Sequence, residues 1–168
     1  KHMPGHGRAM SDSHLEMPRV EASLDELRES DFRPFQALRD MPLGISAHVC
    51  YSALDGEAPG TLSRTVIQEA IRGAIGFDGL LLSDDLSMEA LSGTLGERAA
   101  AALAAGCDVA LHCNGRAEEM ADVAASVAEL SAEAVRRWDG AKANVKKDNL
   151  SEFSVLSEEF DKLVEMFC

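Results

Sequence analysis

Two aspartates follow directly after a short apolar run, a position in which a carboxylate could take part in chemistry. The run is GLLLS at residues 79–83, and Asp84 and Asp85 come next. A carboxylate at the mouth of an apolar strand is held rigidly and is partly desolvated, which suits a nucleophile or a metal ligand. Because side chains alternate along an extended segment, the two aspartates are expected to point to opposite sides. We predict that Asp84 carries the chemistry and that Asp85 or Ser87 caps the turn over residues 86–91.

A second pair of residues could move protons. Asp12 and His14 lie two positions apart in an extended-looking loop, so their side chains can share a face. An aspartate hydrogen-bonded to one imidazole nitrogen fixes the tautomer and makes the other nitrogen more basic, which produces a general acid/base near neutral pH. Two solvated loop residues would show the same spacing, so this pair alone does not define a site. A metal site at Asp84 is disfavoured, since no nearby ligand has the right spacing.

The elements that must position these residues alternate between strand and helix. Short apolar runs predict strands over residues 43–51, 79–83 and 107–112, and capped periodic runs predict helices over residues 63–76, 95–105 and 117–137. This alternation predicts an α/β fold of parallel βα units with right-handed crossovers. Strands that are apolar throughout are expected where helices cover a parallel sheet or where strands line a barrel.

Polar residues end all three expected strands. His48 lies near the end of the first strand, SDD at residues 83–85 ends the second, and HCN at residues 112–114 ends the third. Ligands bind beyond the carboxyl ends of parallel strands, so this pattern favours one shared site.

The first part of the chain reads as a loop followed by a broken helix. Residues 1–20 are rich in Gly, Pro and polar residues and are expected to be irregular. Ser23 and Glu26 fit a capping box that starts a helix. Pro34 lies inside the helical pattern, so we expect a break or kink near Arg33.

Composition narrows the class of protein. The chain has 168 residues, 46% of them hydrophobic and 27% charged, which are ordinary values for a soluble domain. Its net charge of −13 argues against nucleic-acid and anionic-membrane partners, and no apolar run approaches the roughly 20 residues of a membrane span. The four cysteines form no C-x-x-C pair, so we expect free thiols in a cytoplasmic protein.

Four segments together resemble the bacterial β-N-acetylglucosaminidase branch of glycoside hydrolase family 3. KHMPGHG, followed by DSH at residues 12–14, resembles the family's K-H-F-P-G-H-G…D-S-H signature, with Met3 in place of the usual Phe. GFDGLLLSDDLSMEAL at residues 76–91 is similar to the nucleophile segment of that branch, and ISAHVCYSALD and AAGCDVALHCNG are similar to other segments. The resemblance holds in order and spacing from Lys1 to about Arg137.

The resemblance implies a role for individual residues. It implies that Asp84 is the catalytic nucleophile, that His14 is the acid/base with Asp12 as its orienting partner, and that Lys1 and His2 bind sugar hydroxyls. The implied reaction is retaining hydrolysis that releases a terminal β-linked N-acetylglucosamine. The implied substrates are peptidoglycan fragments that contain anhydro-N-acetylmuramic acid and are recycled in the cytoplasm. Neither a metal nor an organic cofactor is implied.

The same resemblance gives the loop a function. His6 lies between Gly5 and Gly7 in the loop that carries His14. The two glycines would let this loop fold over the sugar and place His14 after the substrate has bound.

The length conflicts with a whole barrel of this family. An eight-stranded (β/α)8 barrel needs roughly 200–250 residues, and family members carry about half a barrel before the Lys-His motif. The predicted fold is therefore the second half of a TIM barrel, with residues 1–137 forming a partial catalytic domain. A half barrel leaves strand edges and apolar interior uncovered. We expect self-association, pairing with a missing N-terminal half, or a remnant that folds poorly or rearranges.

The last part of the chain does not resemble the family. Residues 138–168 are expected to form a linker, with a turn at Asp139-Gly140, and an appended amphipathic helix from Ser151 onward. Its apolar positions recur at three- and four-residue spacing at Phe153, Leu156, Phe160, Leu163 and Phe167. This helix would cover exposed core or form a seam for self-association.

Two functional hypotheses follow from the sequence. The first is an N-acetylglucosaminidase, complete or completed by a partner. The second is a truncated, non-catalytic fragment or interaction protein that keeps the motifs and needs a missing N-terminal half for activity.

Overall fold

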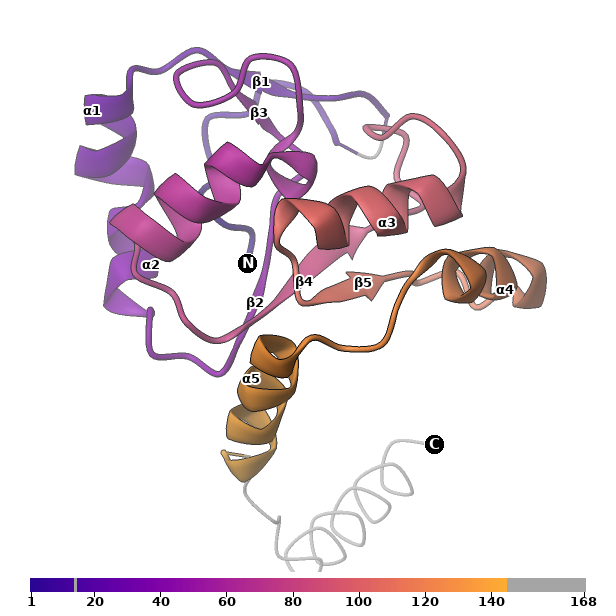
Figure 1. Ribbon diagram of the computed structural model, residues 1–168. Helices are drawn as coiled ribbons and strands as arrows, with labels where there is room; N and C mark the ends of the chain where they lie inside the picture. Colours follow the sequence, from indigo (N-terminus) through magenta and orange to yellow (C-terminus); the bar gives the residue numbers. More distant parts are fainter. Residues whose placement is uncertain (14, 145–168) are drawn as a thin grey trace, which may run out of the picture.

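The computed structural model describes residues 1–13 and 15–144 (Figure 1). His14 and the expected amphipathic helix after Ser151 lie outside the described residues. In chain order the elements are β1 (Arg19–Val20), α1 (Leu24–Glu26), η1 (Leu27–Asp31), α2 (Arg33–Ala37), β2 (Leu43–Ile45), β3 (Cys50–Tyr51), η2 (Gly60–Leu62), η3 (Val66–Ala74), β4 (Leu80–Asp85), α3 (Leu95–Ala105), β5 (Val109–Leu111), α4 (Ala117–Ser126) and α5 (Ala132–Ala143).

A parallel sheet in the order β2-β4-β5 forms the centre of the fold, which confirms the predicted α/β class. Leu80 of β4 pairs with Leu43 of β2, and Leu82 pairs with Val109 of β5. Both connections between these strands contain helices, as parallel pairing requires. β4 is the middle strand, paired with β2 as far as Leu82 and with β5 as far as Asp85 at its carboxyl end.

The expected single strand over residues 43–51 is wrong, because the structure divides it in two. β2 pairs with β4, whereas β3 pairs with β1 in a separate two-stranded parallel sheet. Between them, the carbonyl of Ala47 accepts from the Thr61 amide, and the carbonyl of Val49 accepts from the Gly60 amide. The backbone of this stretch is therefore satisfied by the η2 turn and not by a neighbouring strand.

Capping residues mark most of the helix starts that the sequence predicts. Ser23 and Thr94 each form a capping box with the glutamate three positions later, at the starts of α1 and α3. The break expected near Pro34 is present, since η1 ends at Asp31 and α2 begins at Arg33. Gly106, with φ of 121°, ends α3 at the predicted position.

The continuous helix expected over residues 117–137 is wrong. α4 ends at Ser126, and Ser131 begins a new helix by accepting a hydrogen bond from the Ala134 amide. The turn expected at Asp139-Gly140 is also wrong, since α5 runs through both residues to Ala143.

The two faces of the central sheet are covered unequally. Leu81 is fully buried, in the same core cluster as Ile71 of η3 and Ala102 of α3. On the opposite face, the register places Ile45, Leu82 and Val109 in one row, and all three are only half-buried. A parallel sheet with helices on one face and an incompletely covered apolar row on the other is a TIM-barrel-like fragment.

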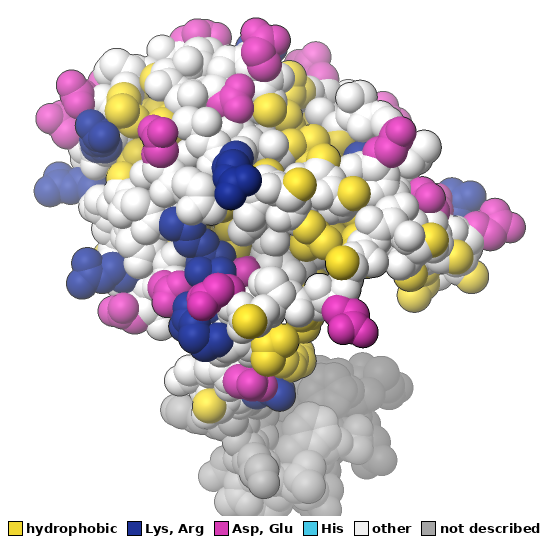
Figure 2. Space-filling model, viewed as in Figure 1, with side chains coloured by type: hydrophobic (Ala, Val, Ile, Leu, Met, Phe, Trp, Pro, Cys, Tyr) yellow, Lys and Arg dark blue, Asp and Glu magenta, His cyan; other side chains and the backbone are white. Residues whose placement is uncertain are grey.

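Apolar side chains also reach the surface beside β5 and on α5 (Figure 2). A groove there is lined by Leu103, Val109, Val123 and Leu130, among others. Among the described residues, no helix combines the length and the hydropathy needed to cross a membrane.

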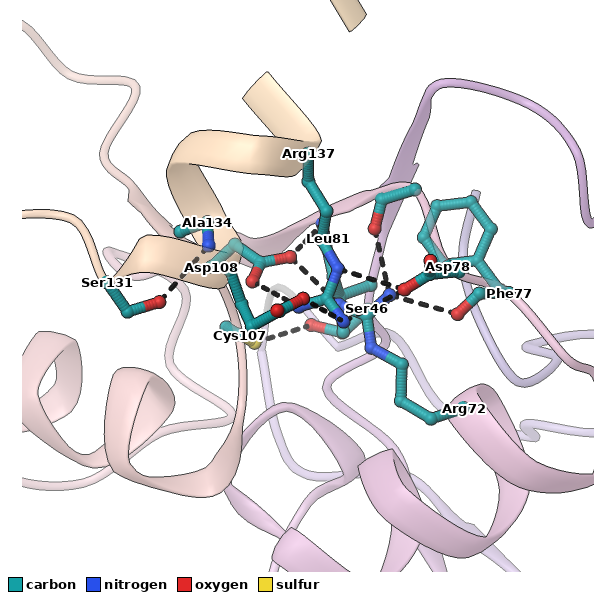
Figure 3. A network of polar contacts seen from close by, with 12 residues as sticks. Ser46, Arg72, Phe77, Asp78, Leu81, Cys107, Asp108, Ser131, Ala134 and Arg137 are labelled. Carbon is teal, nitrogen blue, oxygen red and sulfur yellow. Dashed lines mark hydrogen bonds and ion pairs between the residues drawn. The ribbon is translucent and has the colours of Figure 1, made fainter. Parts of the chain in front are cut away.

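The amino end of the sheet is fastened to α5 by a buried carboxylate, Asp108 (Figure 3). Its Oδ2 accepts from Arg72 Nη2 and from the Leu81 amide, each at 2.8 Å, and its Oδ1 accepts from Arg137 Nη1 at 2.8 Å. Arg72 also donates to the carbonyl oxygens of Phe77 and Gly79. One carboxylate therefore joins η3, β4 and α5.

We expect Asp108→Asn to destabilise the chain by about 3 kcal/mol, because it removes the carboxylate that pairs with the mostly buried Arg72 and one of the two aspartates that pair with Arg137. Urea denaturation of the full chain measures this. Asp139→Asn is the matched control, because Asp139 forms an ion pair with Lys142 in which both side chains are exposed. A loss no larger than that of the control would contradict the role given to Asp108.

Candidate active site

Asp84 lies at the carboxyl end of β4, where the fold class places its chemistry. Its Oδ1 accepts a hydrogen bond from the Asp85 amide at 3.0 Å, and its Oδ2 lies 3.5 Å from His2 Nε2. The side chain keeps 14% of its exposure, so the carboxylate is partly desolvated and still accessible. One oxygen is thus held by the backbone, while the other faces a group from the loop.

Asp85 has a structural role, as the sequence predicts. Its Oδ1 accepts from the Ser87 amide and the Cys113 amide, and its Oδ2 accepts from the Ser87 hydroxyl at 2.7 Å. Burial alone would raise the pKa of Asp85, but these hydrogen bonds outweigh it and lower the pKa. Asp85 therefore ties the end of β4 to the turn after it and to the segment after β5, while Asp84 contacts different partners.

His2 is the loop residue that the structure brings to Asp84. The Met3 amide donates to the Ile45 carbonyl at 2.8 Å, which extends the sheet by one bridge and fixes the residue before it. The Lys1–His2 and Met3–Pro4 peptide bonds are cis. Burial lowers the pKa of His2, and the nearby Asp84 carboxylate opposes that shift by favouring the charged ring. Lys1 itself is exposed and lies in a groove with Met3 and Leu43 at the edge of β2.

The loop is anchored at its base. The buried Tyr51 hydroxyl donates to the Gly5 carbonyl at 2.8 Å, and Arg8 forms an ion pair with Asp31 at 2.8 Å. A side chain on Gly5, whose φ is 145°, would crowd Asp31, whereas Gly7 has open space around it. The structure thus makes Gly7 the freer of the two glycines, and loop closure over the sugar stays a prediction.

A series of contacts connects Asp84 to the part of the loop that precedes His14. The rings of His2 and His6 pack edge-to-face with centroids 5.9 Å apart, and His6 Nε2 lies 3.2 Å from the Ser13 hydroxyl. Asp12 is exposed, and its carbonyl accepts from the amides of Leu15 and Glu16. The structure therefore brings the segment that holds Asp12 toward the β4 end through His6 and Ser13, although His14 lies outside the described residues.

The sequence did not predict the parts played by His6 and Ser13. Both follow from contacts between residues seven positions apart in an irregular loop, which no periodicity reports. The one available signal was the concentration of histidines in the first 14 residues.

Two further histidines lie beneath this site. His48 is fully buried, and its ring bridges Thr61 Oγ1 and the Asp85 carbonyl. His112, with 6% of its side chain exposed, lies with Nε2 3.0 Å from Glu119 Oε2 and Nδ1 4.0 Å from Asp85 Oδ1. The described residues contain no group of three or more His, Cys, Asp or Glu side chains that could hold a metal ion.

Comparison with known proteins identifies the class that this fold and site define. Residues 1–146 match the family described as "Glycosyl hydrolase family 3 N terminal domain". The chain belongs to glycoside hydrolase family 3.

Particular relatives narrow the comparison. The chain is 48% identical over 128 residues to a protein named beta-hexosaminidase from Tolumonas auensis, which covers 72% of this chain and 37% of that protein. It is 47% identical over 120 residues to a beta-hexosaminidase from Pseudomonas aeruginosa, covering 70% of this chain and 36% of that protein. The crystal structure of NagZ from Neisseria gonorrhoeae in complex with N-trifluoroacetyl-D-glucosamine superposes with a TM-score of 0.72 at 36% identity, over 83% of this chain and 40% of that chain. The chain thus spans little more than a third of the length of these curated relatives.

We expect Asp84→Asn to lower the pKa of His2 further, because the substitution removes the anion that favours the protonated ring. NMR titration of the imidazole resonances measures this without any substrate. Asp40→Asn is the control, since Asp40 is 95% exposed and forms a loose ion pair with Arg39 at 4.0 Å. An unchanged or raised His2 pKa in Asp84→Asn would contradict the contact between His2 and Asp84.

Proposed function

We propose that this chain carries the catalytic residues of a retaining β-N-acetylglucosaminidase. The observation that carries the proposal is the Asp84 carboxylate, which lies at the carboxyl end of a central parallel strand with one oxygen fixed and the other directed toward a loop histidine. The names of the relatives support the same activity, since they are beta-hexosaminidases. In this proposal Asp84 is the nucleophile, His14 the acid/base, Asp12 its orienting partner, and Lys1 and His2 the groups that bind sugar hydroxyls.

The proposed reaction has two displacements. Asp84 attacks the anomeric carbon while the protonated His14 gives its proton to the leaving oxygen, which forms a glycosyl-enzyme ester and releases the aglycone. Neutral His14 then takes a proton from water, the water attacks the same carbon, and the ester bond to Asp84 breaks. A histidine with an ordinary pKa of ~6.5 can both give and take a proton near neutral pH.

The backbone contributes to the first step of this mechanism. The Asp85 amide donates to Asp84 Oδ1, so that oxygen is already paired and Oδ2 is the one open for attack. The ionised carboxylate is the form that acts as the nucleophile.

We further propose that the substrates are N-acetylglucosaminyl peptidoglycan fragments processed in the cytoplasm. The described cysteines Cys50, Cys107 and Cys113 are free thiols, which supports a reducing compartment.

A completing partner is part of the proposal. The half-buried row of Ile45, Leu82 and Val109 faces the side of the sheet that a closed barrel would fill. Leu43 is 53% exposed on the edge strand β2, and the Met3–Ser46 bridge covers this edge only at its far end, so much of it can still accept another strand. These features favour pairing with the remaining barrel half, with self-association as the other way to cover them. They also support the second candidate function, a non-catalytic fragment that needs such a partner.

We expect Asp84→Ala to lower the hydrolysis of an aryl β-N-acetylglucosaminide by about 1,000-fold or more, because the covalent intermediate cannot form. Added azide should restore turnover with an activated aryl leaving group and give the α-glycosyl azide, since azide enters from the vacated face. Asp40→Ala is the control and should keep full activity. Turnover of Asp84→Ala near that of the control would exclude Asp84 as the nucleophile.

We expect hydrolysis by the chain to rise at least about tenfold when it is mixed with the N-terminal half-barrel of the Tolumonas relative. Binding of the missing barrel half would bury the apolar row of the central sheet and close the substrate pocket. Sedimentation of the mixture and assay of the same sample measure this. A stable complex without turnover would favour the non-catalytic fragment instead.

A further inference from the structure

His48 is a buried residue that bonds to the neighbour of Asp84 in the chain, Asp85, and it is not part of the mechanism proposed above. Its side chain has no exposure, and both ring nitrogens have hydrogen-bond partners. Nδ1 lies 2.9 Å from Thr61 Oγ1, and Nε2 lies 3.0 Å from the carbonyl oxygen of Asp85. Thr61 Oγ1 is in turn 2.7 Å from Ser46 Oγ.

These partners define the tautomer of His48. A carbonyl oxygen can only accept, so Nε2 must carry a hydrogen and donate it to Asp85. Burial lowers the pKa of His48, although the Asp85 carbonyl and the nearby Asp84 and Asp85 carboxylates oppose this and Arg98 adds to it. In the neutral ring Nδ1 has no hydrogen, so Thr61 donates its hydroxyl hydrogen to Nδ1 and accepts one from Ser46.

Asp85, which accepts the hydrogen bond from His48, also holds the Asp84 carboxylate through its own amide. Its amide donates to Asp84 Oδ1 at 3.0 Å, its carboxylate binds Ser87 and the Cys113 amide, and its carbonyl is bound by His48. The Asp85 carbonyl also accepts from the Met88 amide at 3.2 Å, so the His48 bond is its tie to a part of the chain outside its own turn. Loss of the His48 bond leaves the carbonyl bound within that turn alone and lets the strand end shift.

We propose that His48 is a positioning residue for Asp84, acting as a neutral Nε2–H donor that fixes Asp85 and, through the Asp85 amide, the attacking carboxylate. The inference rests on the proposed role of Asp84. A histidine with a purely structural role would be equally buried and hydrogen-bonded. In that case kcat would not depend on the hydrogen-bond donor at Nε2.

The first test is independent of activity. Long-range ¹H–¹⁵N NMR of the full chain at pH 7.5 should show His48 as the neutral Nε2–H tautomer. An Nδ1–H tautomer or a protonated ring at this pH would overturn the proposal, whatever the protein hydrolyses.

The second test uses two substitutions in the hydrolytically active form of the protein, the chain alone or the chain with its barrel complement. His48→Leu keeps much of the volume and removes the donor, and we expect kcat to fall on the order of 10- to 100-fold with KM within about twofold. His48→Gln can place an N–H near the Nε2 position and should recover most of that loss. The pH profile should not move in either variant, because His48 transfers no proton in the proposed reaction. Equal rates for Leu and Gln, or a loss confined to KM, would overturn the proposal.

Thr61→Val keeps the test decisive even if His48→Leu does not fold. Removing the Thr61 hydroxyl takes away the donor to Nδ1, while the Asp85 carbonyl still requires a hydrogen on Nε2. We therefore expect the Nε2–H tautomer to persist and kcat to fall because the ring is held on one side alone, whereas Thr61→Ser should resemble the wild type. Unchanged kcat in Thr61→Val would contradict the positioning role. Failure of the proposed function is a separate outcome, recognised by full turnover in Asp84→Ala while the His48 tautomer is as expected.

Discussion

Hydrogen bonds from separate parts of the chain hold the carboxyl end of β4, and the geometry of the candidate site depends on them. β4 is the middle strand, so β2 and β5 fix its line on either side. Asp85 then joins the strand end to the following turn, to the Cys113 amide and to His48. Asp84 is positioned through Asp85, because the Asp85 amide donates a hydrogen bond to Asp84 Oδ1.

The amino end of the central sheet holds an ion-pair network that stabilises the fold, whereas the carboxyl end holds the candidate catalytic carboxylate. At the amino end, Asp108 is surrounded by two arginines and a backbone amide, which compensates a buried charge fully. At the carboxyl end, Asp84 has one backbone donor and one histidine at 3.5 Å, which leaves an oxygen able to react. This separation is typical of βα barrels, in which one rim stabilises the fold and the other carries the site.

Local features of the fold could be predicted from the sequence, whereas contacts between distant residues could not. The capping box at Ser23 and the stop at Gly106 are local in sequence, and the helices begin or end there. The strand over residues 43–51 was predicted too long, because its break depends on Gly60 and Thr61, which no local pattern connects to it.

The same distinction holds for the site. Asp84 and the capping role of Asp85 followed from strand alternation and from the turn after it. The approach of His2 to Asp84 joins residues 82 positions apart, and the tautomer of His48 depends on a carbonyl 37 positions away. Motif resemblance pointed to His2 but gave no reason to single out His48.

The central claim is that Asp84, and not its neighbour, forms the covalent bond to the sugar. The most direct measurement is to treat the active form of the protein with a fluorinated N-acetylglucosaminyl-type inactivator, which forms the ester and hydrolyses slowly, and to map the label by peptide mass spectrometry. The account predicts one label per chain on the peptide that spans residues 76–91, with fragmentation placing it on Asp84. A label on Asp85 or on another peptide would contradict it, and so would turnover of the natural linkage without any trapped ester.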